Sequence, residues 1–326
     1  MLSRVAGSLY WMSRYVERSG NNARTLSSQL IRMLEDSDQD TLDHNWEVVL
    51  EICASKKEYS KHYSRLNSEN VLHYFVRSQE NENSLFNLLE LAREKARESR
   101  TIIPESIWEL MNRSYLEKKV QMDEPLNSNA IQSDLDDILD MSTSFQGIIE
   151  SSMLRGEPYI FIKIGKWIER AETTARILKV ICEKATADKG NTDLQVFDHC
   201  LHALQVANGY DSFIMEHKLT LNPYEVITFL IEEERFPRSI MYCVEHTLRA
   251  VEQLNPGKSL QSTEELLELL ANTKRGIERT DVAEMTMDEL LSFLKGFQDH
   301  CDRINEVFSA TYNLDSYKRR SVESRR

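Results

Sequence analysis

The chain has 326 residues, of which 41% are hydrophobic and 29% charged, as in an ordinary globular protein. Its formal net charge of −13 argues against a nucleic-acid-binding body, because such proteins usually carry a basic face. The 10 glycines and 6 prolines are fewer than strand-and-turn architectures need. These numbers predict a nearly all-helical protein, long enough for roughly two domains of about 150 residues each.

Cysteine usage and hydropathy indicate where the protein works. The five cysteines are widely spaced and include no C-x-x-C pair: Cys53, Cys182, Cys200, Cys243 and Cys301. This pattern favours reduced thiols in a helical core over a disulfide framework. The first residues lack the apolar stretch of a secretion signal, and no apolar run approaches the ~18 residues of a membrane span. We therefore expect a cytoplasmic protein that does not enter a membrane.

The first half of the chain shows helix after helix. Apolar residues step by threes and fours from Ser3 to about Glu35, which predicts one long amphipathic helix. Further helices are predicted over about 42–55, 68–77, 84–100, from Pro104 onward, and 130–154. Residues 155–158, Arg-Gly-Glu-Pro, form the clearest joint. The second half then reads as helices over about 159–184, 226–231, 239–254, 264–277 and 287–312, with a segment near 197–201 matching the second helix of the first half.

An internal repeat organises these helices. Tyr-Val-Glu-Arg at 15–18 and Ala-Arg-Thr-Leu at 23–26 return as Trp-Ile-Glu-Arg at 167–170 and Ala-Arg-Ile-Leu at 175–178, an offset of 152 residues throughout. Repeats reveal architecture directly. The repeat predicts an all-α helical bundle built from two halves of about five to six helices each, over 1–155 and 156–315. A basic tail, 316–326, follows; we expect it to be flexible and solvated, with anionic lipid or nucleic acid as the alternative partner.

Each copy carries a polar row along its long helix. Arg14, Glu17, Asn21 and Arg24 share one face of the first helix, and Lys166, Glu169, Thr173 and Arg176 share the matching face of the second. Large apolar residues continue both rows, which favours a partly buried row between packed helices over a solvated face. Buried ions must be paired. We predict an ion network that includes Glu17, Arg18, Arg24, Glu169, Arg170 and Arg176, with pairing of Glu17 to Arg176 and of Glu169 to Arg24 as the simplest arrangement.

The network has three interpretations at this level: a structural set of ion pairs, a site for a ligand or partner, or a catalytic site.

A second candidate site is Arg-Phe-Pro-Arg at 235–238. Pro237 suits the first position of a helix, so free N–H groups would lie beside Arg235 and Arg238 and could hold a phosphate or carboxylate. The alternative is a packed helix entry with Arg–Glu pairs.

Other chemical motifs are weak or missing. His199 and His202 share a helix face, but the Glu-x-x-His pairs of di-iron bundles do not occur. The sequence contains no Gly-rich phosphate loop, no G-x-S-x-G and no Cys/His nucleophile arrangement. We therefore predict no metal, no cofactor and no self-contained ATP site, and we assign no catalytic residue.

The motifs together resemble the bacterial alpha-E domain family. The resemblance rests on the opening residues 1–6, on Leu-Tyr-Trp-Met-x-Arg-Tyr-x-Glu-Arg at 9–18, on the second Glu-Arg copy at 167–172 and on Arg-Phe-Pro-Arg-Ser at 235–239. It spans essentially the whole chain. Gly-Asn-Asn at 20–22 departs from the family pattern, in which a more helix-favouring, often acidic, residue is expected after Ser19. We expect it to loosen the first helix locally, since glycine costs up to about 1 kcal/mol in a helix.

The resemblance implies an all-helical domain with a Glu-Arg motif and no established activity. Members are typically encoded beside, or fused to, circularly permuted ATP-grasp proteins, often with a transglutaminase-like protein nearby. ATP-grasp enzymes join a carboxylate to an amine through an acyl phosphate. The implied function is that of a helical accessory or partner protein in a peptide- or amide-forming system. The alternatives are an enzyme or small-molecule binder using the Glu-Arg rows with Arg235 and Arg238, or a purely structural, oligomerising bundle.

Overall fold

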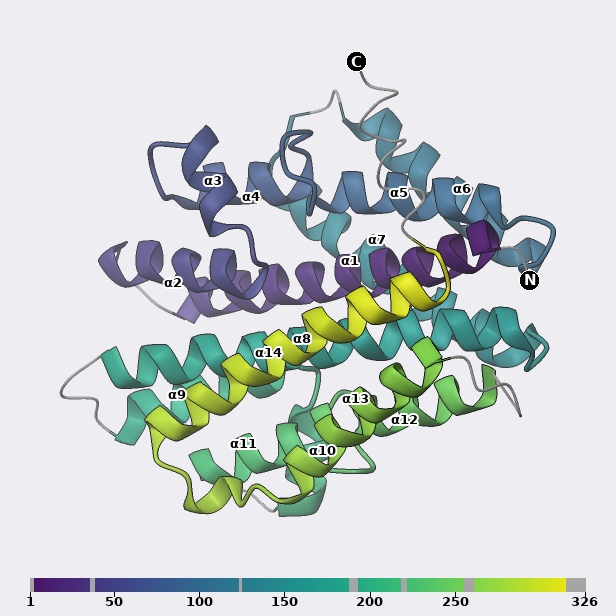
Figure 1. The fold of residues 1–326 in the computed structure, drawn as a ribbon. Coiled ribbons are helices and arrows are strands. Elements are labelled where there is room, and N and C mark those ends of the chain that lie inside the picture. The colour runs from purple at the N-terminus through teal and green to yellow at the C-terminus, as the bar shows by residue number, and fades with distance from the viewer. Residues whose placement is uncertain are drawn as a thin grey trace. The chain divides into compact units, whose positions relative to one another are not determined.

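The computed structural model describes residues 3–35, 39–122, 125–187, 193–217, 222–254 and 261–314 (Figure 1). Within these ranges the regular structure comprises fourteen α-helices and a short 3₁₀ turn, with no strand. The all-α fold class is therefore confirmed. The predicted basic tail, 316–326, lies outside the described residues.

The first seven helices are α1 (Ser3–Glu35), α2 (Gln39–Ile52), α3 (Lys56–His62), α4 (Ser68–Val76), α5 (Leu85–Glu98), α6 (Glu105–Gln121) and α7 (Ser128–Ser152). The next seven are α8 (Glu157–Ala187), α9 (Asp193–Val206), α10 (Tyr210–His217), α11 (Pro223–Glu232), α12 (Ile240–Leu254), α13 (Gln261–Glu278) and α14 (Met287–Thr311).

The chain divides into two compact units. Unit 1 comprises Met1–Arg14 with Leu154–Arg326, and unit 2 comprises Tyr15–Met153. The long helix α1 therefore gives its N-terminal part to unit 1 and the remainder to unit 2. This division describes packing. The boundary between residues 155 and 156 is a different one: it separates the two copies of the sequence repeat, and it stays a prediction.

Unit 2 is a set of helices that pack on one another. Helix α5 packs on α6, α6 on α7, and α4 on both α5 and α7. Polar caps start three of these helices: Asn67, Ser84 and Asn127 each accept a hydrogen bond from the backbone N–H three residues later. Such caps satisfy N–H groups that the helix leaves unpaired. Trp46 and Tyr74 are fully buried in the core of the chain.

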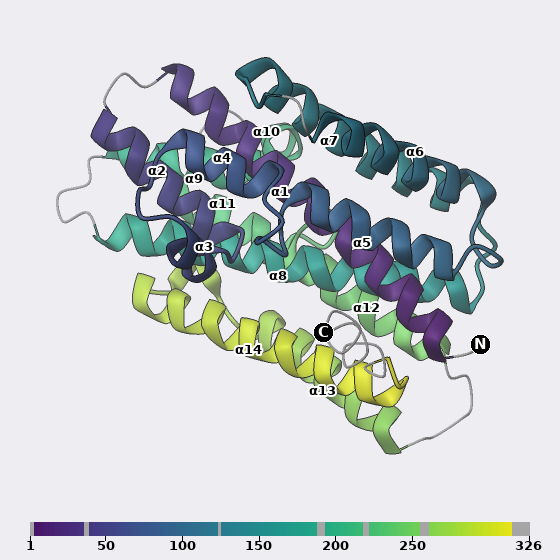
Figure 2. The same ribbon diagram turned by 90° about the horizontal axis from the view of Figure 1, so that it is seen from above.

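Unit 1 is organised around α8. This helix contacts α9, α11, α12 and α14, and Figures 1 and 2 both show α14 running alongside it. A capping box between Thr286 and Glu289 starts α14. The N-terminal part of α1 completes the unit: the ring of Tyr10 lies 5.0 Å from that of Phe308, and Gly7 lies close to the backbone of Leu314.

Two short helices were not predicted. Helices α3 and α10 have 7 and 8 residues, and each buries a single side chain, Tyr59 and Phe213 respectively. One buried residue cannot produce the three- and four-residue spacing by which an amphipathic helix is recognised. Both buried rings stack on the residue four positions later, Tyr63 and His217.

Candidate functional site

The glutamate of the second Glu-Arg copy is the centre of a buried ion cluster in unit 1. Helix α8 places Glu169 in the interior, where its side chain is 1% exposed. Its Oε2 accepts a hydrogen bond of 2.7 Å from Nε of Arg14 on α1. The Arg14 side chain is itself only 4% exposed, and its Nη2 donates to Oε2 of Glu172 at 2.5 Å. One guanidinium therefore joins two carboxylates that lie three residues apart on α8.

Helix α14 closes the cluster through Asn305. The Asn305 Oδ1 accepts hydrogen bonds from the Tyr10 hydroxyl at 2.6 Å and from Nη1 of Arg14 at 2.7 Å. The Asn305 amide donates in turn to Oε1 of Glu172 at 2.5 Å. We call Tyr10, Arg14, Glu169, Glu172 and Asn305 the α1–α8–α14 network. It connects three helices that are far apart in the sequence, and a buried polar cluster is favourable only when its members are satisfied in this way.

Electrostatics hold Arg14 in its charged form. Burial alone would lower its pKa, but the negative charges of Glu172 and Glu169 keep the pKa well above its ordinary value. The guanidinium also lies 5.4 Å from the ring of Trp11, a cation–π distance. An arginine with this environment serves as a permanent cation. It can organise carboxylates, but it cannot exchange protons near neutral pH.

The buried phenol of Tyr10 makes the stability of the fold depend on pH above pH 10. Burial raises its pKa from 10.0 to about 12. The folded state therefore keeps the phenol neutral between pH 10 and 12, whereas the unfolded state ionises it. The stabilisation is fully present below pH 10 and is lost as the pH rises towards 12, by roughly 3 kcal/mol over two pH units.

We predict that the variant Tyr10→Phe loses less stability than the wild type as the pH rises from 10 to 12. Near neutral pH the variant should be less stable by about 1 kcal/mol, because one hydrogen bond is gone. Denaturant unfolding at pH 8 to 11.5 measures the difference, which should shrink and reverse as the pH rises. Tyr210→Phe, at an exposed position, is the control. A constant difference across this range would contradict the assigned role of Tyr10.

The other motif residues divide by burial. Glu17 is 1% exposed, whereas the four motif arginines are only half-buried: Arg18, Arg24, Arg170 and Arg176. Arg24 donates from Nη1 to Oδ1 of Asn21 at 3.3 Å. The pairings of Glu17 with Arg176 and of Glu169 with Arg24 would join residues of different units, and they stay predictions.

The arginine of each Glu-Arg pair holds the turn before a later helix. In unit 2, Nη1 of Arg18 donates to Oδ1 of Asn83 at 3.4 Å, and the Asn22 amide donates to the backbone oxygen of Asn83 at 2.9 Å. These contacts fix the turn that leads into α5. Asn83 was not identified as a functional residue from the sequence, because no local pattern connects it to α1.

Unit 1 repeats this contact. Nη1 of Arg170 donates to the backbone oxygen of Pro237 at 3.2 Å, and the Thr174 hydroxyl donates to the backbone oxygen of Arg238 at 2.8 Å. Both contacts anchor the turn before α12. The Arg-Phe-Pro-Arg stretch and the second Glu-Arg copy, which are far apart in the sequence, thus meet at one place.

The predicted position of Pro237 is wrong. Helix α12 begins at Ile240, and Pro237 lies in the preceding turn. Ser239, the residue before the helix, caps it instead: its Oγ accepts a hydrogen bond from the N–H of Tyr242 at 3.0 Å. Serine is a strong capping residue, so the hydroxyl supplies the acceptor that a bound anion would have supplied.

Arg235 and Arg238 lie on either side of this turn with different surroundings. The Arg235 side chain is 70% exposed and contacts two carboxylates, Glu233 at 2.8 Å and Glu216 at 2.9 Å. Arg238 is half-buried, with its backbone oxygen bound to Thr174. Because Arg235 already neutralises acidic neighbours, an added anion would have to compete with both.

Sequence reasoning missed Glu172 and Asn305. Glu172 carries a weak signal, since it lies one turn after Glu169 and so on the same side of α8. Asn305 carries none, because an asparagine inside an amphipathic helix looks like any surface residue. Tyr10 was interpreted as an apolar end to the polar row, although its hydroxyl belongs to the network.

The described residues show neither a metal-binding cluster nor a membrane-spanning helix. Across the described ranges, no group of three or more His, Cys, Asp or Glu side chains is arranged to hold a metal ion. Among the helices that the structure describes, none has both the length and the hydropathy of a membrane span.

A family comparison accounts for the repeated Glu-Arg pairs. Residues 1–312 match the Alpha-E family, which is described as a predicted alpha-helical domain with a conserved ER motif. The chain belongs to the Alpha-E family. The two Glu-Arg pairs of this Alpha-E protein, at 17–18 and 169–170, both fall inside the match and inside long helices. No curated protein and no solved structure gave a significant match.

Within this Alpha-E chain the two residues of the second Glu-Arg pair contact different elements. The glutamate at 169 faces inward to Arg14, and the arginine at 170 faces a turn. Adjacent residues on a helix point about 100° apart, so one dipeptide can bind two different elements. The arrangement fastens long helices to the segments that surround them.

Proposed function

We propose that this Alpha-E protein is a helical accessory subunit of an ATP-grasp-type system that forms peptide or amide bonds. In this role it acts through its outer surface, by binding the ATP-grasp protein. The family resemblance suggests the partner. A transglutaminase-like protein is a further candidate member of the same assembly.

The observation that carries this proposal is the engagement of the Glu-Arg residues inside the chain. The Glu169 carboxylate is 1% exposed and bound to Arg14, a permanent cation. A general acid or base needs access to substrate and a pKa near the working pH. This carboxylate has little access, so the motif suits a supporting role, and recognition falls to exposed side chains.

The most suitable recognition surface in unit 1 surrounds α10. Met215 on this helix is 87% exposed, which is unusual for so large an apolar side chain. The next residue, Glu216, binds the exposed Arg235 of the turn before α12 at 2.9 Å. Methionine and arginine are both enriched at protein interfaces. We therefore place the partner contact at Met215 and Arg235, with the Arg170 and Thr174 contacts positioning the turn.

Co-expression with the ATP-grasp protein of the same genome, followed by affinity purification, tests the proposal. The two proteins should co-elute at a fixed ratio. Met215→Asp and Arg235→Ala should each reduce the recovered partner at least tenfold with an unchanged melting temperature. Val120→Asp on α6, at a 74% exposed position, is the matched control and should retain the partner. Separate elution of the two wild-type proteins would rule the proposal out.

We also propose that the chain arose by duplication of one seven-helix unit. Helices α1 to α7 have 33, 14, 7, 9, 14, 17 and 25 residues, and α8 to α14 have 31, 14, 8, 10, 15, 18 and 25. The paired lengths differ by at most two residues. Unrelated helical segments have no reason to share both order and length.

Matching aromatic contacts support the duplication. In unit 2, Tyr59 stacks on Tyr63 with centroids 4.9 Å apart and meets Tyr74 edge-on at 5.2 Å. In unit 1, Phe213 stacks on His217 at 4.5 Å and meets Phe229 edge-on at 5.4 Å. The proposal predicts that an experimental structure will superpose α1–α7 on α8–α14 in order. A different order of equivalent helices would contradict it.

A further inference from the structure

Helix α6 carries an apolar strip on its outer face. The strip consists of Leu116 and Val120, which are 49% and 74% exposed and lie one turn apart. Residues four positions apart share one face of a helix. In the part of the chain that the structure describes, no other helix exposes two large apolar side chains at this spacing. Contiguous apolar surface is typical of interaction sites.

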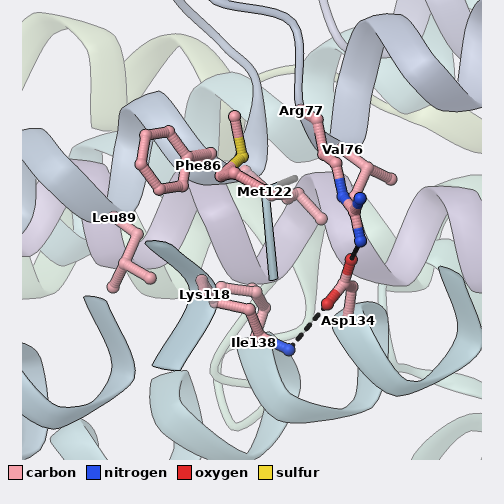
Figure 3. A pocket seen from close by; sticks show the side chains of 9 residues that line it. Val76, Arg77, Phe86, Leu89, Lys118, Met122, Asp134 and Ile138 are labelled. Carbon is pink, nitrogen blue, oxygen red and sulfur yellow. Dashed lines mark hydrogen bonds and ion pairs between the residues drawn. The ribbon is translucent and has the colours of Figure 1, made fainter. Parts of the chain in front are cut away.

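Contacts with α7 fix the inner face of α6. Nζ of Lys118 lies 2.7 Å from Oδ1 of Asp134 (Figure 3) and 2.5 Å from Oδ2 of Asp137. The cavity beside the Asp134 pair has a volume of about 20 Å³, room for about one water molecule. Lys118 is two residues from both Leu116 and Val120, so it points about 160° away from them. The helix therefore cannot turn its apolar strip inward without breaking these ion pairs.

The sixth helix of the second half, α13, has a polar outer face over residues 263–278. Its exposed residues there are Glu264, Glu265, Glu268, Asn272, Arg275, Gly276 and Glu278. Helices α6 and α13 are both packed on the helix that follows, α7 and α14 respectively. A helix in this position thus packs without exposed apolar residues, so folding alone does not explain Leu116 and Val120.

Two opposite charges extend the apolar strip towards the start of α6. Glu109 and Arg113 are exposed and lie on the same face as Leu116 and Val120. A glutamate and an arginine at this spacing commonly pair within one helix. Among the described residues, however, neither side chain has an ion-pair or hydrogen-bond partner. Both charges are therefore available to another molecule.

This face of α6 is complementary to a second copy of itself. When two α6 helices lie antiparallel about a two-fold axis midway between Glu109 and Arg113, the glutamate of each chain meets the arginine of the other. A two-fold interface makes every such contact twice. In the same register Val120 lies opposite Ile102, which is 37% exposed. Apolar contacts therefore flank two reciprocal ion pairs.

We propose that the protein forms a two-fold symmetric homodimer through the outer face of α6. The two helices pack antiparallel, and Glu109 of each chain binds Arg113 of the partner subunit. Leu116 covers the small side chain of Ser106 of the partner subunit. One helix face is a smaller contact than the roughly 1,200–2,000 Å² of stable interfaces, so the dimer dissociates on dilution.

Analytical ultracentrifugation of the full-length protein over a range of concentrations tests this proposal. The wild type should show a monomer–dimer equilibrium. Glu109→Arg and Arg113→Glu should each weaken dimerisation at least tenfold, because like charges then meet at both ion pairs. An equimolar mixture of the two variants should form the dimer again, since each pair is once more opposite in sign. A variant that had failed to fold could not produce this recovery.

Val120→Asp should also weaken dimerisation at least tenfold, with an unchanged melting temperature. Met215→Asp on α10, at a position that is 87% exposed, is the matched control and should leave the dimer unchanged. Three results would overturn the proposal: a wild-type protein that stays monomeric at every concentration, a dimer that Val120→Asp does not weaken, or a mixture of the two charge variants that stays monomeric.

Discussion

Arg14→Met should lower the free energy of unfolding of unit 1 by about 3–5 kcal/mol, the range measured when one partner of a buried ion pair is removed. Methionine fills much of the space but leaves Glu169 and Glu172 without their shared cation. The two side chains are 1% and 12% exposed, so water cannot fully replace the guanidinium. For a unit of this size the melting temperature should fall by roughly 6–20 °C.

Chemical denaturation followed by circular dichroism measures this loss. Arg249→Ala is the matched control, because Arg249 is 63% exposed and pairs with Glu245 one turn away on α12. Exposed pairs contribute about 0.2–1 kcal/mol. Adding Glu169→Gln and Glu172→Gln to Arg14→Met should recover part of the loss, because neutral amides are less costly to bury than carboxylates. A loss below 1 kcal/mol in Arg14→Met would mean that the network carries little of the fold.

Gly165→Ala should destabilise unit 1 by about 3 kcal/mol, the upper part of the range for overpacking. An added Cβ at this position would lie 2.5 Å from the backbone oxygen of Tyr10 and 3.3 Å from its carbonyl carbon. Backbone cannot move aside as a flexible side chain can, so α1 and α8 would have to separate. The movement would also disturb the hydrogen bond between Tyr10 and Asn305.

Gly296→Ala on α14 is the control with the opposite sign. An added Cβ there meets nothing within 4 Å. Alanine is the better helix former, so this variant should gain about 0.5–1 kcal/mol. Thermal unfolding of the two variants side by side measures the difference. If Gly165→Ala were as stable as Gly296→Ala, the close approach of α1 and α8 would be refuted.

Several local features of the protein could be predicted without coordinates. The long first helix, the start of α5 at Ser84 and the all-α class follow from spacing and capping residues, which act within one or two turns. The positions of α3 and α10 could not, because one buried aromatic ring per helix leaves no periodic pattern. The predicted range of α12, 239–254, agrees with the structure, but Pro237 was wrongly placed at its first position, because Ser239 two residues later supplies the capping hydroxyl.

The candidate site was predictable only as a set of charged rows. The sequence showed that Glu169 lies on a polar face bounded by apolar residues, but it did not identify Arg14 as its partner. A carboxylate in such a row can be reached from several helices, and the choice depends on how those helices cross. The structure places Asn305 between Tyr10, Arg14 and Glu172, a meeting of residues almost 300 positions apart that no local pattern records.

By itself, the sequence determined which of the longer segments are helical, where most of them begin and which faces are apolar, because these properties arise from neighbours a few residues away. The tertiary structure alone decided which atoms meet: Arg14 with two glutamates, Arg18 and Arg170 with their turns, and Lys118 with two aspartates. Those contacts depend on the packing of distant helices, where a shift of a few ångströms exchanges one charged partner for another.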